Sequence, residues 1–262
     1  MSRRQPRAPA AAAEIAVDGA VAAEFRRRLV AWYRRNARDL PWRRTRDAYR
    51  VLVSELMLQQ TQVSRVLDYY ARFLRRFPTL RDVARARPQR VMEAWAGLGY
   101  YARARNLHEL ARTVTDGGRR GRGQLPPTPD ALRKLPGVGA YTAGAVACFA
   151  HEARAELVDT NVARVLTRVF APDVDPRSGH GTRQIWSLAR RLLPRTGRAT
   201  WTYNQALMEL GALVCTARSR NCPRCPVRAL CRTASARGEG RAGADCAGGR
   251  ISSGSSGGRR SA

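Results

Sequence analysis

The sequence predicts a tight hairpin between two helices at Leu135-Pro136-Gly137-Val138-Gly139-Ala140-Tyr141-Thr142-Ala143-Gly144. Its glycines allow a sharp turn, and the backbone amides that open the next helix can face a phosphate, where the helix dipole favours negative charge. A glycine-containing turn is also the ordinary connection between two helices. By itself, the stretch therefore indicates a tight turn between two helices and leaves phosphate binding as one of two interpretations.

Apolar residues recur at helical spacing on both sides of this hairpin. Helices are predicted over 21–36, 49–73 (as a pair), 80–95, 102–114, 131–135, 142–150, 162–170, 182–193 and 202–214. Short turns that carry Gly, Pro, Asp or Asn separate them. Alternating strand patterns are nearly absent, so the sequence predicts an all-α protein.

The chain is strongly basic, with 48 Lys and Arg against 20 Asp and Glu and a net charge of +28 over 262 residues. Residues 1–13 carry +3 and the residues after Cys231 carry +4, which leaves +21 on the segment between them. A field of this size favours a polyanionic partner, either nucleic acid or an anionic membrane surface. No stretch approaches the ~20 consecutive apolar residues of a membrane span.

Four of the six cysteines, Cys215, Cys222, Cys225 and Cys231, are spaced C-x6-C-x2-C-x5-C. Four thiolates this close in sequence can surround one metal centre, and the absence of an export signal favours ligation over disulfides. A four-cysteine zinc site uses the same ligands as an iron–sulfur cluster. The spacing alone leaves both groups open.

The two ends of the chain differ from the middle in composition. Residues 1–18 combine arginines with an alanine run, and they predict a disordered basic tail rather than a signal peptide. In residues 232–262, Gly and Ser make up 14 of 31 positions, which is too little apolar material to form a core. We therefore expect a second disordered tail there.

Two carboxylates stand out by their surroundings. Glu55 lies within the apolar run Leu52-Val53-Ser54-Glu55-Leu56-Met57-Leu58, so it is either on a solvated helix face or in a pocket that raises its pKa. Asp159 precedes a helical run and is a good N-cap. Neither pattern by itself establishes catalysis.

The cysteine spacing, downstream of the hairpin and Asp159, resembles that of the helix–hairpin–helix DNA glycosylases of the endonuclease III superfamily. Ser54-Glu55-Leu56-Met57-Leu58-Gln59-Gln60-Thr61-Gln62-Val63 is very similar to the signature of the MutY-type adenine DNA glycosylases. The resemblance covers about residues 20–231. It implies a six-helix barrel lobe at 43–153, and a cluster lobe made of 19–42 and 154–231 in which the four cysteines hold one 4Fe–4S cluster.

The resemblance also implies catalytic roles. Glu55 would be the general acid that protonates adenine, and Asp159 would stabilise the positive sugar or attack it transiently. Tyr141 and Asn161 match further active-site positions and would hydrogen-bond these two carboxylates. In bifunctional relatives a lysine stands at the position of Tyr141 and forms a Schiff base with the sugar. The tyrosine therefore predicts a monofunctional enzyme that leaves an abasic site without a nick.

DNA contacts follow from the same resemblance. Gln60 and Tyr100 would enter the base stack, and Thr61 and Leu98 would lie near the opposing purine. The hairpin residues Gly137, Val138 and Gly139 would grip the phosphate backbone without reading sequence.

The sequence thus predicts a monomeric DNA repair glycosylase that excises adenine opposite 8-oxoguanine or guanine from double-stranded DNA. We expect it in the bacterial cytoplasm, on the nucleoid and not on a membrane. Relatives usually carry a C-terminal Nudix-like domain, which we do not expect here because 31 residues follow Cys231. The alternatives are a thymine or uracil mismatch glycosylase of the same superfamily and a non-catalytic iron–sulfur DNA-binding protein.

Overall fold

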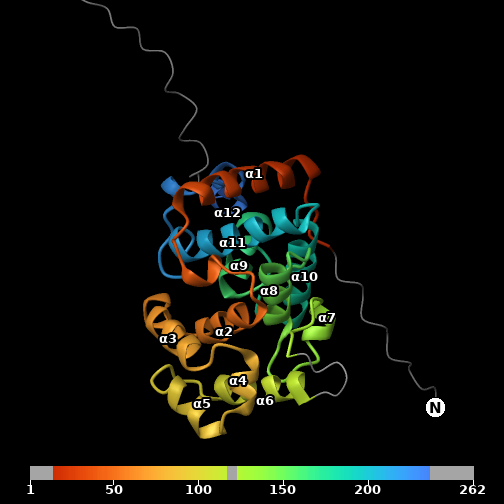
Figure 1. Cartoon of the computed structure of the whole chain (residues 1–262). Helices are drawn as coiled ribbons and strands as arrows, with labels where there is room; N and C mark the ends of the chain where they lie inside the picture. Colours follow the sequence, from red (N-terminus) through yellow and green to blue (C-terminus); the bar gives the residue numbers. More distant parts are fainter. Residues whose placement is uncertain (1–13, 117–122, 237–262) are drawn as a thin grey trace, which may run out of the picture.

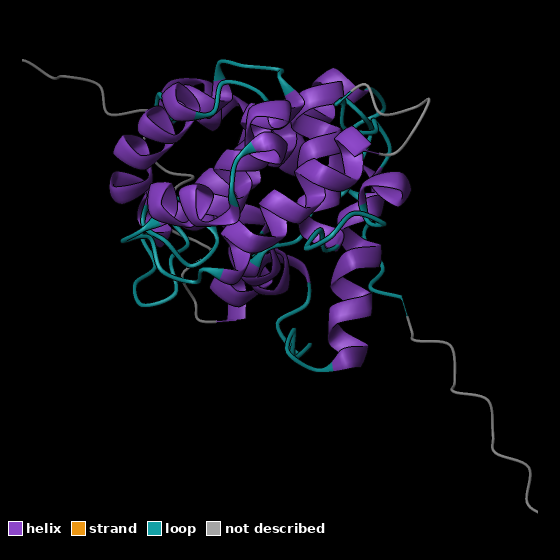
Figure 2. Cartoon of the chain, turned by 60° about the horizontal axis from the view of Figure 1, so that its bottom comes forward, coloured by secondary structure: helices purple, strands orange, loops and turns teal. Residues whose placement is uncertain are grey.

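The computed structural model describes residues 14–116 and 123–236, and within these ranges it contains helices and no strand (Figure 2). The all-α prediction is confirmed. The α-helices are α1 (Gly19–Asn36), α2 (Ala48–Leu58), α3 (Val63–Arg76), α4 (Leu80–Arg85), α5 (Pro88–Trp95), α6 (Ala102–Asp116), α7 (Pro129–Leu132), α8 (Ala140–His151), α9 (Thr160–Phe170), α10 (Gly179–Arg191), α11 (Gly197–Leu213) and α12 (Arg232–Ala236). Short 3-10 turns occur at Pro41–Arg43, Cys222–Arg224 and Arg228–Leu230.

Three boundaries differ from the sequence-based expectation. The single helix expected over 80–95 is two helices, because Ala86 and Arg87 are extended and Pro88 opens α5. Residues 232–236, expected to belong to the C-terminal tail, instead form α12, which follows Cys231 directly and buries Ala234 against α9. The N-terminal tail expected over 1–18 is also shorter than predicted, since Asp18 caps α1 and Ile15 and Val17 pack against the core. Residues 1–13 and 237–262 lie outside the described residues.

The helices form two groups that share one core. In Figure 1, α1 lies with α9, α11 and α12 at one end of the molecule, and α3, α4, α5 and α6 lie at the other end. Helix α8 packs against both α2 and α11, so it connects the two groups. Buried apolar side chains run continuously through both. The division into lobes at 43 and 154 stays a prediction.

Side-chain caps set where the helices of the cleft begin. Asp47 accepts a hydrogen bond from the backbone of Arg50 and starts α2. Asp159 does the same for Val162 and starts α9. An N-cap of this kind stabilises a helix by about 1 kcal/mol. Both carboxylates therefore contribute to where the cleft walls stand.

No helix in the two described ranges combines the length and the apolar character needed to cross a membrane.

Candidate active site

A cleft of about 640 Å³, open to solvent, lies between the two groups of helices. One wall comes from α2 and the loop that follows it, and the other comes from α11 and the segment before α2. The first turns of α8 and α9 close the remaining side. Its polar lining residues are Arg38, Arg43, Glu55, Gln59, Gln60, Thr61, Gln62, Tyr141, Asp159, Thr160, Asn161, Gln205 and Glu209.

Glu55 is buried on α2, with 4% of its surface exposed, where the cleft meets the core. The Tyr141 hydroxyl donates a hydrogen bond of 2.8 Å to its Oε2. Burial raises the pKa of Glu55 to about 7, assisted by the charge of Asp159 and opposed by the Tyr141 hydrogen bond and by Arg43. The carboxyl group therefore carries a proton over part of the neutral pH range, as a general acid requires.

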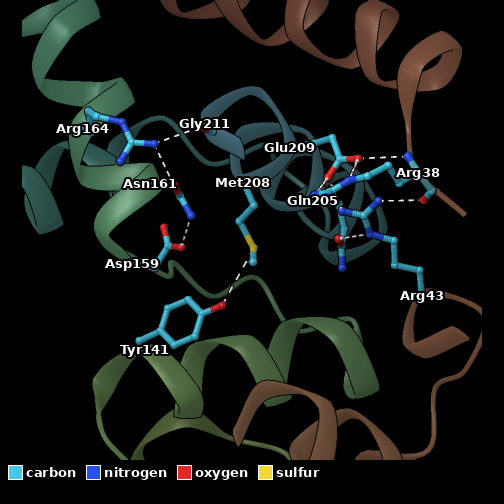
Figure 3. Close-up of polar contacts among 10 residues, drawn as sticks. All are labelled: Arg38, Arg43, Tyr141, Asp159, Asn161, Arg164, Gln205, Met208, Glu209 and Gly211. Atoms are coloured by element: carbon cyan, nitrogen blue, oxygen red, sulfur yellow. Dashed lines mark hydrogen bonds and ion pairs between the residues drawn. The ribbon is translucent and has the colours of Figure 1, made fainter. Parts of the chain in front are cut away.

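Tyr141 projects from the first turn of α8 toward Met208 on α11, and its hydroxyl lies 4.0 Å from the Met208 sulfur (Figure 3). Burial, together with the nearby charges of Glu55 and Asp159, raises the pKa of Tyr141 well above 10. The phenol therefore remains a neutral donor at any working pH. It has no amine with which to form a Schiff base.

Asp159 combines its cap with a second contact. Its Oδ1 accepts the Val162 amide at 2.7 Å, and its Oδ2 accepts the Asn161 side-chain amide at 3.0 Å. Asn161 in turn accepts a hydrogen bond of 2.7 Å from Arg164 (Figure 3). A Cβ at Gly211 would stand 2.8 Å from that of Asn161, so the glycine permits α11 to approach the start of α9. Asp159 is thus held in one orientation on the cleft.

The structure brings together Glu55, Tyr141, Asp159 and Asn161, the four predicted catalytic residues, on this one cleft. It also places there a polar group that sequence reasoning missed. Glu209 on α11 is fully buried and ion-paired with Arg38 at 2.8 Å and Arg43 at 2.7 Å. Arg43 also donates to the Gln205 side chain at 2.9 Å (Figure 3). An acid within the apolar run Leu207-Met208-Glu209-Leu210 was the available signal.

The residues predicted to enter or flank the base stack lie on two adjacent loops. Gln60 follows α2 and is exposed, and Thr61 beside it is half-buried. Tyr100 precedes α6 and exposes 59% of its surface. Leu98 is 6% exposed and packs into the core, so its side chain is less available to DNA than the resemblance implied.

The predicted hairpin between helices is present as the turn from α7 to α8. Gly137 adopts φ 71°, and a Cβ there would lie 2.5 Å from the Cβ of Asn106, so both conformation and space require glycine. Gly139 caps α8 and is exposed, whereas Val138 is buried. The exposed backbone at both glycines and the start of α8 are available to a phosphate.

Cys215, Cys222, Cys225 and Cys231 line one small, largely apolar cavity of about 30 Å³ beside α9. Arg168 donates to the Cys215 sulfur at 3.3 Å. Burial and the three neighbouring thiols raise the pKa of Cys225 to about 12. Within the described chain, no three His, Cys, Asp or Glu side chains converge closely enough to hold a single metal ion as they stand.

These features together define a helix–hairpin–helix protein with a carboxylic acid and a second carboxylate on a cleft. The family model described as "HhH-GPD superfamily base excision DNA repair protein" matches residues 53–191. The chain belongs to this superfamily.

Similar proteins from several organisms are described as adenine DNA glycosylases. The chain is 47% identical to that of Rattus norvegicus over 230 residues, and the match covers 83% of this chain and 43% of the relative. It is 46% identical over 200 residues to that of Mycolicibacterium smegmatis, with 76% of this chain and 66% of the relative covered. The chain thus spans between two fifths and two thirds of the length of these relatives.

Solved structures agree with the fold. A thermostable thymine-DNA glycosylase matches with a TM-score of 0.74 and 30% identity, covering 83% of this chain and 98% of that chain. A trapped covalent complex of endonuclease III with DNA matches with a TM-score of 0.67 and 25% identity, covering 82% and 98%.

Proposed function

We propose that the protein is an adenine DNA glycosylase that hydrolyses the bond between adenine and deoxyribose when the adenine faces 8-oxoguanine or guanine in duplex DNA. The observation that carries the proposal is the buried Glu55, with a pKa of about 7, beside Asp159 on a cleft large enough for a nucleobase. The identity of 46–47% to proteins described as adenine DNA glycosylases supports adenine as the base.

The chemistry divides between the two carboxyl groups. Adenine is a poor leaving group, so protonated Glu55 delivers its proton to the base, at N7, and becomes a carboxylate. The C1′–N9 bond then breaks, its electron pair leaves with adenine, and positive charge develops on the sugar. Asp159 stabilises that charge or adds to C1′ transiently, until water supplies the hydroxyl group and releases a proton. Glycoside hydrolases divide the work of two carboxylates in the same way.

Tyr141 and Asn161 position this pair. Tyr141 donates to Glu55, and Asn161 donates to Asp159. Lys134, the only lysine of the chain, precedes the hairpin rather than lining the cleft. We therefore propose a monofunctional reaction that ends at the abasic site. That the enzyme acts as a monomer on chromosomal DNA in the bacterial cytoplasm stays a prediction.

We propose that the four cysteines hold a 4Fe–4S cluster, which would fix the shape of the segment from Cys215 to Cys231 beside α9 and position it for DNA. A tetrahedral zinc ion needs all four sulfurs at about 2.3 Å from one point. Thiols spread around a common cavity suit a cluster better, because each cysteine binds a different iron. Arg168 and Arg220 line the cavity and would balance the negative charge of the cluster. Iron and sulfide analysis of the brown, anaerobically purified protein tests this proposal, and stoichiometric zinc would contradict it.

A single-turnover excision assay tests the proposed reaction. The duplexes carry A opposite 8-oxoguanine, A opposite G, and T opposite G, and each reaction is analysed with and without alkali. We expect strand breaks at A only after alkali. The similarity to a thymine-DNA glycosylase favours thymine as the second candidate, and release of thymine from the third duplex would establish it instead. No excision by folded protein that binds DNA would favour a non-catalytic role.

A further inference from the structure

The two loops predicted to enter the base stack share an unusual backbone conformation. Only three residues other than glycine have positive φ in the described ranges, and two of them are Gln60, at 55°, and Tyr100, at 48°. This left-handed region is unfavourable for residues with a Cβ and persists only where the surroundings enforce it. Something must therefore hold both loop tips.

One side chain contacts both loops. Arg103 on α6 is 6% exposed, and its guanidinium lies between the end of α2 and the loop that precedes α6. In α2 and the loop after it, Arg103 donates hydrogen bonds to the carbonyls of Leu56 at 2.8 Å, Met57 at 2.9 Å and Gln59, and to the Thr61 hydroxyl at 3.3 Å. In the loop before α6, Arg103 donates hydrogen bonds to the carbonyls of Gly99 at 2.9 Å, Leu98 at 3.3 Å and Tyr100 at 3.3 Å.

These contacts explain why a buried cation is tolerated there. The last four carbonyls of a helix have no partner within it, and they form the negative end of its dipole. Arg103 satisfies two such carbonyls of α2, at Leu56 and Met57. Its guanidinium also lies 5.6 Å from the Trp95 ring centre and 5.5 Å from that of Tyr100. No acidic side chain of the described chain pairs with Arg103, so its positive charge is stabilised mainly by backbone carbonyls.

We propose that Arg103 is a positioning residue that couples the Gln60 and Tyr100 loops into one rigid wedge, so that both tips enter the base stack together. The role rests on the proposed function, because it assigns a task to loops that would meet DNA. A lysine could replace the charge but not the coupling, since a planar guanidinium with five donors reaches both loops at once, whereas an ammonium has three donors at a single point.

The first test measures the rates of amide hydrogen exchange in the two loops of the protein without DNA. The reporters are the Thr61 amide, bonded to Leu58, and the Leu98 amide, bonded to Trp95. We expect Arg103→Met to speed exchange at both by about tenfold or more, Arg103→Lys to give a smaller increase at both, and Arg105→Met, an exposed position on the same helix, to change neither. Faster exchange in one loop alone, or in neither, would overturn the coupling. If the Met variant does not fold, the Lys variant carries the comparison.

The second test measures entry into DNA without requiring excision. A tetrahydrofuran abasic analogue replaces the target nucleotide, and 2-aminopurine next to the opposing guanine reports unstacking by its fluorescence. At saturating protein we expect the wild type and Arg105→Met to raise the fluorescence equally, and Arg103→Met to give less than about one fifth of that rise. A full rise with Arg103→Met, or none with the wild type, would overturn the proposal. Failure of the proposed function is a separate result, namely no adenine release by a wild type that unstacks the duplex.

Discussion

Two glutamates face the same cleft from opposite walls, and the protein treats them in opposite ways. Glu55 on α2 and Glu209 on α11 are both buried, at 4% and 0% exposure. The pKa of Glu55 is raised to about 7, mainly by burial, against a single hydrogen bond from the neutral Tyr141. Burial also raises the pKa of Glu209, but hydrogen bonds from Arg38 and Arg43 outweigh it and lower the pKa to about 2.

Burial alone therefore does not decide the charge of a carboxyl group; its partners do. Arg43 is the instructive side chain, because its charge acts on both acids while its hydrogen bonds go to Glu209, Gln205 and the Arg38 carbonyl and none goes to Glu55. Glu55 on one wall of the cleft retains a proton that it can donate. Glu209 on the other wall is ionised, and its ion pairs connect the segment before α2 to α11. The difference suits an acid catalyst on the first wall and a rigid support on the second.

The largest expected effect is on catalysis at Glu55. Glu55→Gln removes the transferable proton and leaves the shape nearly unchanged, so we expect single-turnover excision to fall by about 10³-fold or more while DNA binding persists. The matched control is Glu109→Gln, which changes an exposed glutamate on α6. Excision by Glu55→Gln within tenfold of the wild type would remove Glu55 from the role of acid.

The next effect is on stability at Glu209. Glu209→Gln leaves two arginines without their buried counter-charge, and removing one partner of such a pair costs about 3–5 kcal/mol. Urea unfolding at pH 7.5 measures this loss directly. Glu55→Gln provides the contrast, because it replaces an acid that is costly to ionise where it is buried, so we expect no comparable loss. Equal stabilities for the two variants would contradict the comparison.

The two acids also predict opposite trends of stability with pH. Because the folded pKa of Glu55 lies above its ordinary value of 4.5, its contribution is fully present below pH 4.5 and is lost as the pH rises through about 7. The folded pKa of Glu209 lies below 4.5, so its contribution is present above pH 4.5 and is lost as the pH falls toward about 2. Relative to wild type, Glu55→Gln should gain stability between pH 5 and pH 8, and unfolding curves at both values test the sign.

The same titration predicts the pH profile of the reaction. Above about pH 7 the fraction of protonated Glu55 falls, so we expect the single-turnover rate to decline by up to about tenfold per pH unit. A rate that is constant from pH 6 to pH 9 would show that no group with this pKa supplies the proton.

The smallest effect is expected for Tyr141→Phe. The tyrosine hydroxyl lowers the pKa of Glu55, so its removal raises that pKa. A hydrogen bond contributes about 1 kcal/mol, which corresponds to less than one pH unit. We expect the alkaline limb of the rate profile to shift upward by that amount, and a downward shift would contradict the assigned direction.

Much of the framework was predictable because it depends on local patterns. Apolar residues at helical spacing predicted most helices, and Gly137 and Gly139 correctly marked the turn before Tyr141, in which Gly137 has positive φ. The break inside 80–95 was visible as Pro88 but was outweighed by the apolar period around it. The start of α12 was missed because composition averages over 31 residues and hides a single buried alanine, Ala234.

The residues of the candidate site were likewise predictable only where a local motif marks them. Glu55, Asp159, Tyr141 and Asn161 were singled out by motif, and the structure places them on one cleft. The pairing of Arg38 and Arg43 with Glu209 could not be found in this way, because Arg38 and Glu209 are 171 residues apart in the chain. No local pattern connects residues at that distance, so only folding brings the arginines to the acid.

The sequence by itself determined the helical class, the hairpin and the grouping of the cysteines, because each depends on residue type and short-range spacing. It marked Glu55 and Asp159 as candidates through a motif resemblance. The tertiary structure alone decided which carboxylate holds a proton and which holds a charge, and which arginine contacts both the Gln60 loop and the Tyr100 loop. The physical reason is that a pKa depends on desolvation and on the charges and donors within a few ångströms. Those neighbours come from distant parts of the chain and exist only once it has folded.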